Sequence, residues 1–149
     1  MGKKFKTKIN ISCSAKSLWK TLTESEFVQQ YMFGSSLECN WKVGDPILYF
    51  MLQDGKRIDM VSGVIERIEE GKILEHSLYP KGASYPPTDE NHIHVLYRIE
   101  AIGENECSLE IEQYGFETAA EGEKRYNDSK NGWEMVLPKL KEVAEAIDS

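Results

Sequence analysis

The sequence is poor in cysteine and has no long apolar run. Its three cysteines, Cys13, Cys39 and Cys107, are an odd number and form no CxxC pair. This pattern argues against both a disulfide framework and a thiolate zinc site, so we expect reduced cysteines. No stretch approaches the roughly 18 apolar residues of a membrane span, and no apolar signal core follows the first lysines. We therefore expect a cytoplasmic protein without a membrane span.

The sequence also lacks an excess of positive charge. It has 18 Lys and Arg against 25 Asp and Glu, a net charge of -7. This charge repels phosphate backbones, which excludes nucleic acid as a partner. Hydrophobic residues make up 40% and charged residues 29% of the chain, ordinary values for a globular protein. Because no repeat or low-complexity stretch interrupts them, residues 1–149 are expected to form a single domain, as a monomer or a homodimer.

Motifs of common enzyme classes are absent as well. The sequence has no GxSxG, HExxH, P-loop or GxGxxG element, so we assign no catalytic residue and expect no cofactor. A serine or cysteine triad stays open, since its members need only be close in space. His92 and His94, with His76 as a third ligand, have a spacing that some zinc sites use. His92 and His94 alternate with Ile93 and Val95, which we expect on the inner face of the strand. The two histidines then face solvent, so we predict no metal site.

Alternating apolar and polar residues predict an antiparallel sheet. The first such run, residues 5–11, has the period of two that is typical of a half-buried strand. Asp54-Gly55 is a strong hairpin signal between two longer runs. The remaining predicted strands are residues 47–53, 57–68, 73–79 and 93–101 and a run around 107–111.

Two short helices are predicted directly after the first strand. Ser14 is the expected N-cap of a helix over residues 15–22. Thr23 and Glu26 have the spacing of a capping box, which predicts a second short helix that carries Phe27 and Tyr31.

From about residue 121 to residue 147, apolar residues recur at helical spacing while lysines and glutamates face away. We expect this long helix to bury Trp133, Leu137 and Leu140 against the sheet. Pro138, close to Gly132, predicts a bend that leaves a cavity between helix and sheet. The predicted fold class is therefore α+β, a helix-grip fold in which a curved antiparallel sheet wraps around a long C-terminal helix.

Four segments of the chain carry a family resemblance. They are residues 11–24 (ISCSAKSLWKTLTE), 41–45 (WKVGD), 54–55 (DG) with 63–68 (GVIERI), and 115–116 (GF) with 132–140 (GWEMVLPKL). In this order they resemble the SRPBCC (START-like) superfamily. Within it, the chain is similar to single-domain proteins related to the activator of the ninety-kilodalton heat-shock protein ATPase. The resemblance implies the helix-grip fold, with a groove between the sheet and the C-terminal helix.

This resemblance leaves three classes of function open. The first, which we favour, is non-catalytic binding of a small hydrophobic or amphipathic molecule in the groove. The second is a co-chaperone-like interaction protein that modulates a heat-shock protein ATPase, with a chaperone as partner. The third is a pocket enzyme of the cyclase or hydrolase type, for which His76, Glu66 and tyrosines are the acid-base candidates.

Aromatic and methionine side chains are the candidate ligand-binding residues. Rings with a polar edge suit an amphipathic ligand, and thioethers adapt to irregular shapes; the alternative for each residue is a core position. Gln113 continues the inward phase of Leu109 and Ile111, so its amide is a candidate polar anchor. The resemblance implies a pocket at Tyr31, Phe33, Trp41, Tyr49, Met51, Met60, Tyr97 and Trp133, to which we add Gln113 and Leu137.

Overall fold

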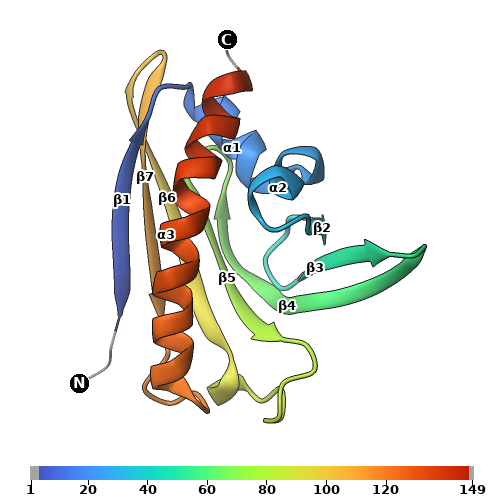
Figure 1. Ribbon diagram of the computed structural model, residues 1–149. Coiled ribbons are helices and arrows are strands. Elements are labelled where there is room, and N and C mark those ends of the chain that lie inside the picture. The colour runs from blue at the N-terminus through green and yellow to red at the C-terminus, as the bar shows by residue number, and fades with distance from the viewer. Residues whose placement is uncertain (1–3, 148–149) are drawn as a thin grey trace.

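The computed structural model describes residues 4–147, which form a curved sheet with the α-helices on its concave face (Figure 1). This arrangement confirms the predicted α+β helix-grip fold, including the two short helices after the first strand. The elements, in chain order, are β1 (Phe5–Ile11), α1 (Ala15–Thr23), α2 (Ser25–Tyr31), β2 (Ser36–Cys39), β3 (Pro46–Gln53), β4 (Lys56–Glu69), β5 (Ile73–Pro80), the 3-10 turn η1 (Asp89–Asn91), β6 (Ile93–Gly103), β7 (Glu106–Tyr114) and α3 (Gly122–Ile147).

The strands form one sheet in the order β1-β7-β6-β5-β4-β3-β2, and every neighbouring pair is antiparallel. The register shifts between Tyr49 and Phe50 on β3, and again between Ile65 and Arg67 on β4. Such irregularities bend a strand and increase its twist. The outer half of the β3–β4 hairpin accordingly projects away from the rest of the sheet (Figure 1).

Gly63 allows β4 to pass close to β5 at this bend. A Cβ at this position would lie 1.8 Å from the backbone oxygen of Ser77, closer than atoms can approach. The Ser77 hydroxyl compensates for the interrupted ladder, because it accepts a hydrogen bond of 3.0 Å from the backbone N–H of Val64. The backbone donor at the bend is thereby satisfied by a side chain of the neighbouring strand instead of by a backbone carbonyl.

The β3–β4 turn has the geometry that its sequence predicts. Asp54 and Gly55 have φ values of 52° and 77°, as the two central residues of a type I′ turn require. By contrast, the sequence analysis did not predict β2, which pairs with β3 from Ser36 to Cys39 at the edge of the sheet. Four residues give too short an alternation to identify a strand without its partner.

The first helix begins as predicted, and the second does not. Ser14 is the N-cap of α1, with its hydroxyl accepting a hydrogen bond of 3.1 Å from the backbone N–H of Ser17. The predicted capping box at Thr23 was wrong: Thr23 is the last residue of α1, and its hydroxyl donates to the carbonyl of Trp19. Glu24 is the N-cap of α2 and makes no side-chain capping bond.

The helix α3 lies across the concave face of the sheet and is continuous through Pro138 (Figure 1). Trp133 and Leu140 are buried as predicted, but Leu137 is only partly buried. Val136 is buried in its place. Positions 133, 136 and 140 follow one side of the helix, whereas position 137 lies at the margin of that side. Figure 1 also shows α1 and α2 beside the C-terminal part of α3.

The convex face of the sheet carries ion pairs. Lys4, directly before β1, pairs with Glu112 on β7, and Arg98 on β6 pairs with Glu110 on β7, each across 2.7 Å. Exposed pairs of this kind contribute little to stability, so the fold depends mainly on the concave side. Among residues 4–147, no helix has the length and apolar character needed to cross a membrane.

Candidate functional site

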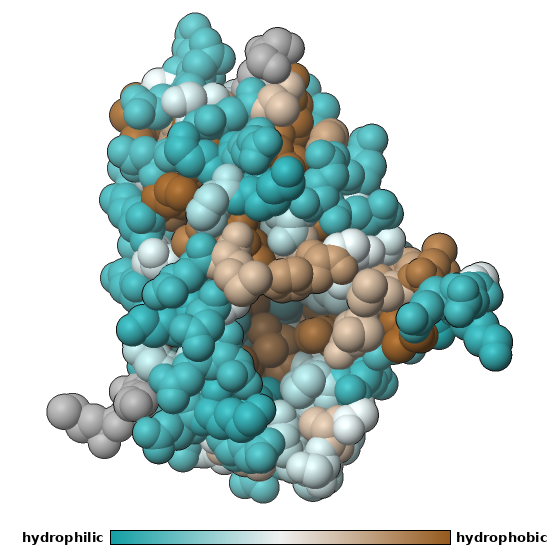
Figure 2. Space-filling model, in the orientation of Figure 1, coloured by the Kyte–Doolittle hydropathy of each residue, from teal (hydrophilic) through white to brown (hydrophobic). Residues whose placement is uncertain are grey.

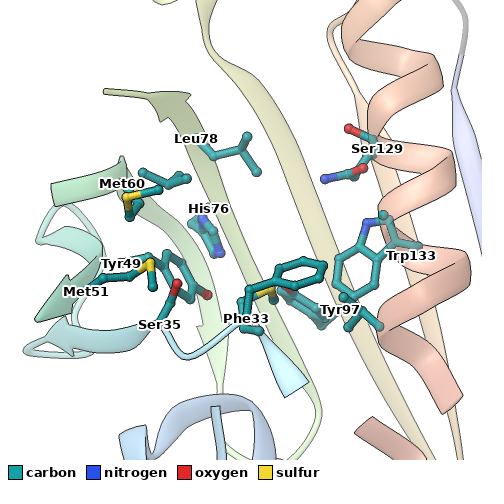
Figure 3. A pocket seen from close by; sticks show the side chains of 15 residues that line it. Phe33, Ser35, Tyr49, Met51, Met60, His76, Leu78, Tyr97, Ser129 and Trp133 are labelled. Carbon is teal, nitrogen blue, oxygen red and sulfur yellow. The ribbon is translucent and has the colours of Figure 1, made fainter. Parts of the chain in front are cut away.

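A cavity of about 320 Å³ lies between the sheet and α3 and opens beside the β3–β4 hairpin. Figure 2 shows it as a hollow with a hydrophobic floor, and Figure 3 shows the side chains around it. Five neighbouring strands, the segment after α2 and one side of α3 supply the lining. The lining residues are Met32, Phe33, Ser35, Tyr49, Met51, Met60, Val61, His76, Leu78, Tyr97, Gln113, Ser129, Gly132, Trp133 and Val136.

The lining of the cavity is mainly apolar and carries no formal charge at neutral pH. None of its residues is Lys, Arg, Asp or Glu. The thioethers of Met32, Met51 and Met60 and the ring of Trp133 make up much of the wall. A space of this composition suits an uncharged apolar molecule, because a charged group would lose its hydration there without gaining a counter-ion.

The space exists because α3 presents small residues to this part of the sheet. Ser129, Gly132, Trp133 and Val136 follow one another at helical spacing along the lining. A Cβ at Gly132 would meet no atom within 4 Å apart from the backbone of its own helix, so the helix surface is open there. Pro138, which the sequence analysis connected with the cavity, is exposed and lies outside the lining.

Exposed apolar side chains surround the mouth of the cavity. Phe33 has a positive φ of 53° and is followed by Gly34 at 81°, which turns the chain sharply after α2. This turn leaves the Phe33 side chain 62% exposed, and Met60 on the opposite rim is 40% exposed. Large apolar residues that surround an opening are typical of a binding surface.

His76 on β5 belongs to the lining of the cavity and is almost fully buried. Its ring contacts those of Tyr49 and Tyr97, with centroid distances of 6.1 and 6.2 Å (Figure 3). Nδ1 is 2.8 Å from the backbone oxygen of Ser77, whereas Nε2 is buried and has no hydrogen-bond partner among the described residues. Burial lowers the pKa of His76 from 6.5 to about 4, against a smaller opposing effect of the Ser77 hydrogen bond. The ring is therefore neutral at physiological pH.

Gln113 lies in the same cross-strand row as His76. His76 pairs with Val95 on β6, and Val95 pairs with Gln113 on β7, so the three side chains share the concave face. Gln113 is buried, as its phase in the sequence predicts, and its Oε1 has no hydrogen-bond partner among the described residues. Two buried acceptor atoms without partners thus belong to the lining of one apolar cavity.

The two tyrosines beside His76 are also neutral. Burial raises the pKa of each phenol far above its ordinary value, because ionisation would place a charge in a dry environment. This part of the lining therefore provides polar contacts without providing charge.

Comparison with known families assigns the chain. A family model described as "Activator of Hsp90 ATPase homolog 1-like protein" matches residues 12–145. The chain belongs to this family. The family is part of the SRPBCC superfamily, as the sequence resemblance implied. Comparison with curated proteins found no match.

Solved structures share the fold of this member of the Hsp90-ATPase-activator-like family. A Cytophaga hutchinsonii protein has 24% identity and a TM-score of 0.74, with 99% of this chain and 97% of the other covered. A Mesorhizobium loti protein has 19% identity and a TM-score of 0.74, with coverage of 97% and 98%. An Hsp90 activator from Plasmodium falciparum has 15% identity and a TM-score of 0.69, with 94% of each chain covered. At such identities the likeness shows the fold alone.

The cavity of this family member brings together most of the predicted ligand-binding residues and leaves three outside. Tyr31 is a core residue whose hydroxyl donates to the backbone oxygen of Thr21. Trp41 lies at a separate surface depression with Trp19 and Ile68, and Leu137 packs against the core beside the cavity. The predicted residues that line the cavity are Phe33, Tyr49, Met51, Met60, Tyr97, Gln113 and Trp133.

The sequence analysis did not include His76 among the ligand-binding residues, although a signal was present. Along β5, His76 lies two residues after Leu74 and two residues before Leu78. Residues at this spacing share one face of a strand, and the two leucines mark that face as the buried one. Its neighbours in the lining, Ser129 and Gly132, gave no such signal because small residues do not mark a face. Their role follows only from the position of α3 over the sheet.

The three histidines of the chain lie in different environments. His76 faces the cavity, whereas His94 stacks on Tyr114 on the opposite face and its Nδ1 lies 2.7 Å from a Glu66 oxygen. His92 contacts the Tyr79 ring. Within residues 4–147, no three His, Cys, Asp or Glu side chains lie close enough together to bind a metal ion.

Proposed function

We propose that the chain binds a small hydrophobic or amphipathic molecule in the cavity between the sheet and α3, without catalysing a reaction on it. The observation that carries this proposal is the open apolar space of about 320 Å³. Natural cores are packed almost without voids, so an open space of this size needs an explanation. Its volume is at the lower end of the range for ligand pockets, which begins at roughly 300 Å³.

The energetics of filling the cavity support the proposal. Each square ångström of apolar surface removed from water contributes about 25 cal/mol, and the ligand would be covered on most sides. Immobilising the ligand offsets part of this gain, so we expect a dissociation constant in the micromolar range. The exposed rings and thioethers at the mouth, Phe33 and Met60, would cover the part of the ligand nearest solvent.

The groups around the cavity favour binding over catalysis. With a pKa of about 4, His76 is neutral and a weak base at physiological pH. Tyr49 and Tyr97 hold their protons tightly for the reason given above. Glu66, the other acid-base candidate in the sequence, is paired with His94 on the convex face of the sheet. The cavity thus offers polar contacts and no strong acid or base.

Ligand titration tests this proposal. Fatty acids, sterols and substituted phenols would be titrated while tryptophan emission and the melting temperature are followed. Because Trp133 lines the cavity and Trp19 does not, a Trp133→Phe variant should lose the emission change while its melting temperature still rises. If no class of compound raises the melting temperature of the unmodified chain at saturation, the proposal fails.

A second candidate function is interaction with a chaperone ATPase. The family description supports it, together with the apolar side chains of Leu52 and Ile58, which are exposed on the projecting β3–β4 hairpin. The test is the ATPase rate of a purified Hsp90-type chaperone with and without the chain. We expect a Leu52→Ser, Ile58→Ser variant to lose any stimulation, and Ile102→Ser on the β6–β7 hairpin to keep it. An unchanged ATPase rate with the unmodified chain excludes this candidate.

A further inference from the structure

The tautomer of His76 follows from its hydrogen bond. A backbone carbonyl only accepts hydrogen bonds, so Nδ1, 2.8 Å from the Ser77 oxygen, must carry the proton that it donates. A neutral imidazole has one N–H, and Nε2 therefore presents a lone pair. This atom is shielded from solvent and accepts no hydrogen bond from residues 4–147.

A buried acceptor without a partner is destabilising, and native structures keep few of them. His76 is 1% exposed, and its side chain belongs to the lining of the cavity. Phe or Leu would fill the same place without an unsatisfied atom, so packing alone does not account for a histidine here. What would satisfy Nε2 is a donor on a molecule inside the cavity.

The surroundings decide which kind of donor fits. Because the lining has no Asp or Glu, a cationic ligand would be desolvated without a counter-charge. An anionic ligand would meet the lone pair of His76 and no Lys or Arg, on a chain whose net charge is already -7. Only an uncharged donor is complementary to both the polar and the apolar parts of the lining.

We propose that the molecule bound in this cavity is uncharged and donates a hydrogen bond from a hydroxyl or N–H group to Nε2 of His76. The inference rests on the proposed small-molecule function and narrows it, because it excludes fatty-acid anions and pure hydrocarbons as preferred ligands. The apolar remainder of the molecule lies toward Trp133, Met51 and the mouth beside Phe33.

Gln113 provides a second polar contact in the same row. It lies two strands from His76, and with strands about 4.8 Å apart the two Cα atoms are separated by roughly 10 Å. Val95 lies between them and is not part of the lining, whereas His76 and Gln113 both are. An amide both donates and accepts, and Gln113 therefore tolerates a second polar group of either kind, whereas His76 requires a donor.

Three matched probes test the inference by isothermal titration calorimetry at pH 7.5, roughly one unit above the ordinary histidine pKa. Para-hexylphenol has a donor, para-hexylanisole has the same skeleton with an acceptor only, and para-hexylbenzoate is an anion. One neutral hydrogen bond corresponds to a difference of about threefold to tenfold in the dissociation constant. We expect the phenol to bind tighter than the anisole by this factor, and the benzoate to bind at least about tenfold more weakly than the phenol.

A His76→Phe variant keeps a ring of similar shape and removes the acceptor. It should bind the phenol and the anisole equally, and His94→Phe on the convex face should preserve the original preference. A Tyr97→Phe variant examines the neighbouring hydroxyl. If this variant loses the preference for the phenol while His76→Phe keeps it, the tyrosine hydroxyl accepts the hydrogen bond of the ligand, and the inference is overturned.

If the unmodified chain binds the phenol and the anisole equally, the inference fails while the proposed function stands. If it binds none of the probes, as well as none of the broader panel, both fail.

Discussion

His76 is the residue at which stability and binding are most closely connected. Its ring packs against those of Tyr49 and Tyr97 and is kept neutral by burial. The folded chain holds the ring in one tautomer through Ser77. The same burial that prepares Nε2 to accept a hydrogen bond therefore makes the fold sensitive to protonation of this side chain.

We predict that His76 destabilises the fold at acidic pH. The unfolded chain takes up a proton on this residue near pH 6.5, whereas the folded chain does so only near pH 4. Between these values the unfolded state binds more protons, so stability is full above pH 6.5 and falls as the pH decreases toward 4. The difference between the two pKa values corresponds to a loss of about 3 kcal/mol.

Urea unfolding of the unmodified chain and of His76→Phe, at a series of pH values, measures this contribution. The difference in unfolding free energy between the two chains isolates His76 from the carboxylates, which titrate in both. We expect this difference to change by about 3 kcal/mol across the window. A difference that does not vary with pH would show that His76 is hydrated, and protonated normally, in the folded chain.

At the scale of elements, α3 serves two purposes along one side. Its C-terminal half packs tightly, with Leu140 and Ala144 fully buried against the sheet and α1. Its middle carries Ser129 and Gly132 where large apolar residues would otherwise fill the space. The helix is therefore a structural support at one end and one wall of the cavity at the other.

We predict that Leu140→Ala costs about 2 to 5 kcal/mol of unfolding free energy, because it removes a buried side chain from the packed end of α3. Met135→Ala on the same helix is the matched control: its side chain is 67% exposed, so it should change stability by less than about 0.5 kcal/mol. Denaturant unfolding measures both. Equal losses for the two variants would contradict the assignment of the buried side of α3.

The elements were largely predictable because their signals are local. Alternation identified β1 and the longer strands, Ser14 identified the start of α1, and the periodic stripe identified α3 to within one residue at its start. The errors came where the signal was short or ambiguous. Thr23 and Glu26 have the spacing of a capping box, but the hydroxyl of Thr23 donates to the carbonyl of Trp19 in the preceding helical turn. The spacing alone does not show which of the two hydrogen bonds the hydroxyl makes.

For the whole molecule, the cavity was predictable in kind and only partly in detail. Rings and thioethers with inward phase, such as Tyr49, Met51 and Tyr97, were identified from the sequence and line the space. Trp41 was misplaced because its position depends on a turn with a positive φ of 60°. The cause of the cavity could not be predicted either. A void forms where the side chains of α3 and of the sheet leave space between them, and the sequence does not show which of these side chains face one another.

A cavity-filling variant tests the central claim, that the space under α3 is the ligand site. Gly132→Leu places a side chain where a Cβ would meet no atom within 4 Å apart from the backbone of its own helix. Asn131→Leu adds the same group on the exposed side of the helix. Removing a glycine from a helix is itself favourable by roughly 0.8 to 1 kcal/mol, so we expect the first variant to fold at least as stably as the unmodified chain.

The decisive measurement is the dissociation constant of para-hexylphenol for these chains by isothermal titration calorimetry. The account predicts that Gly132→Leu weakens binding by at least about tenfold, because the added side chain occupies the space that the ligand would fill, with no loss in melting temperature. Asn131→Leu should bind as the unmodified chain does. Undiminished binding by a stably folded Gly132→Leu variant would contradict the account and move the ligand site elsewhere.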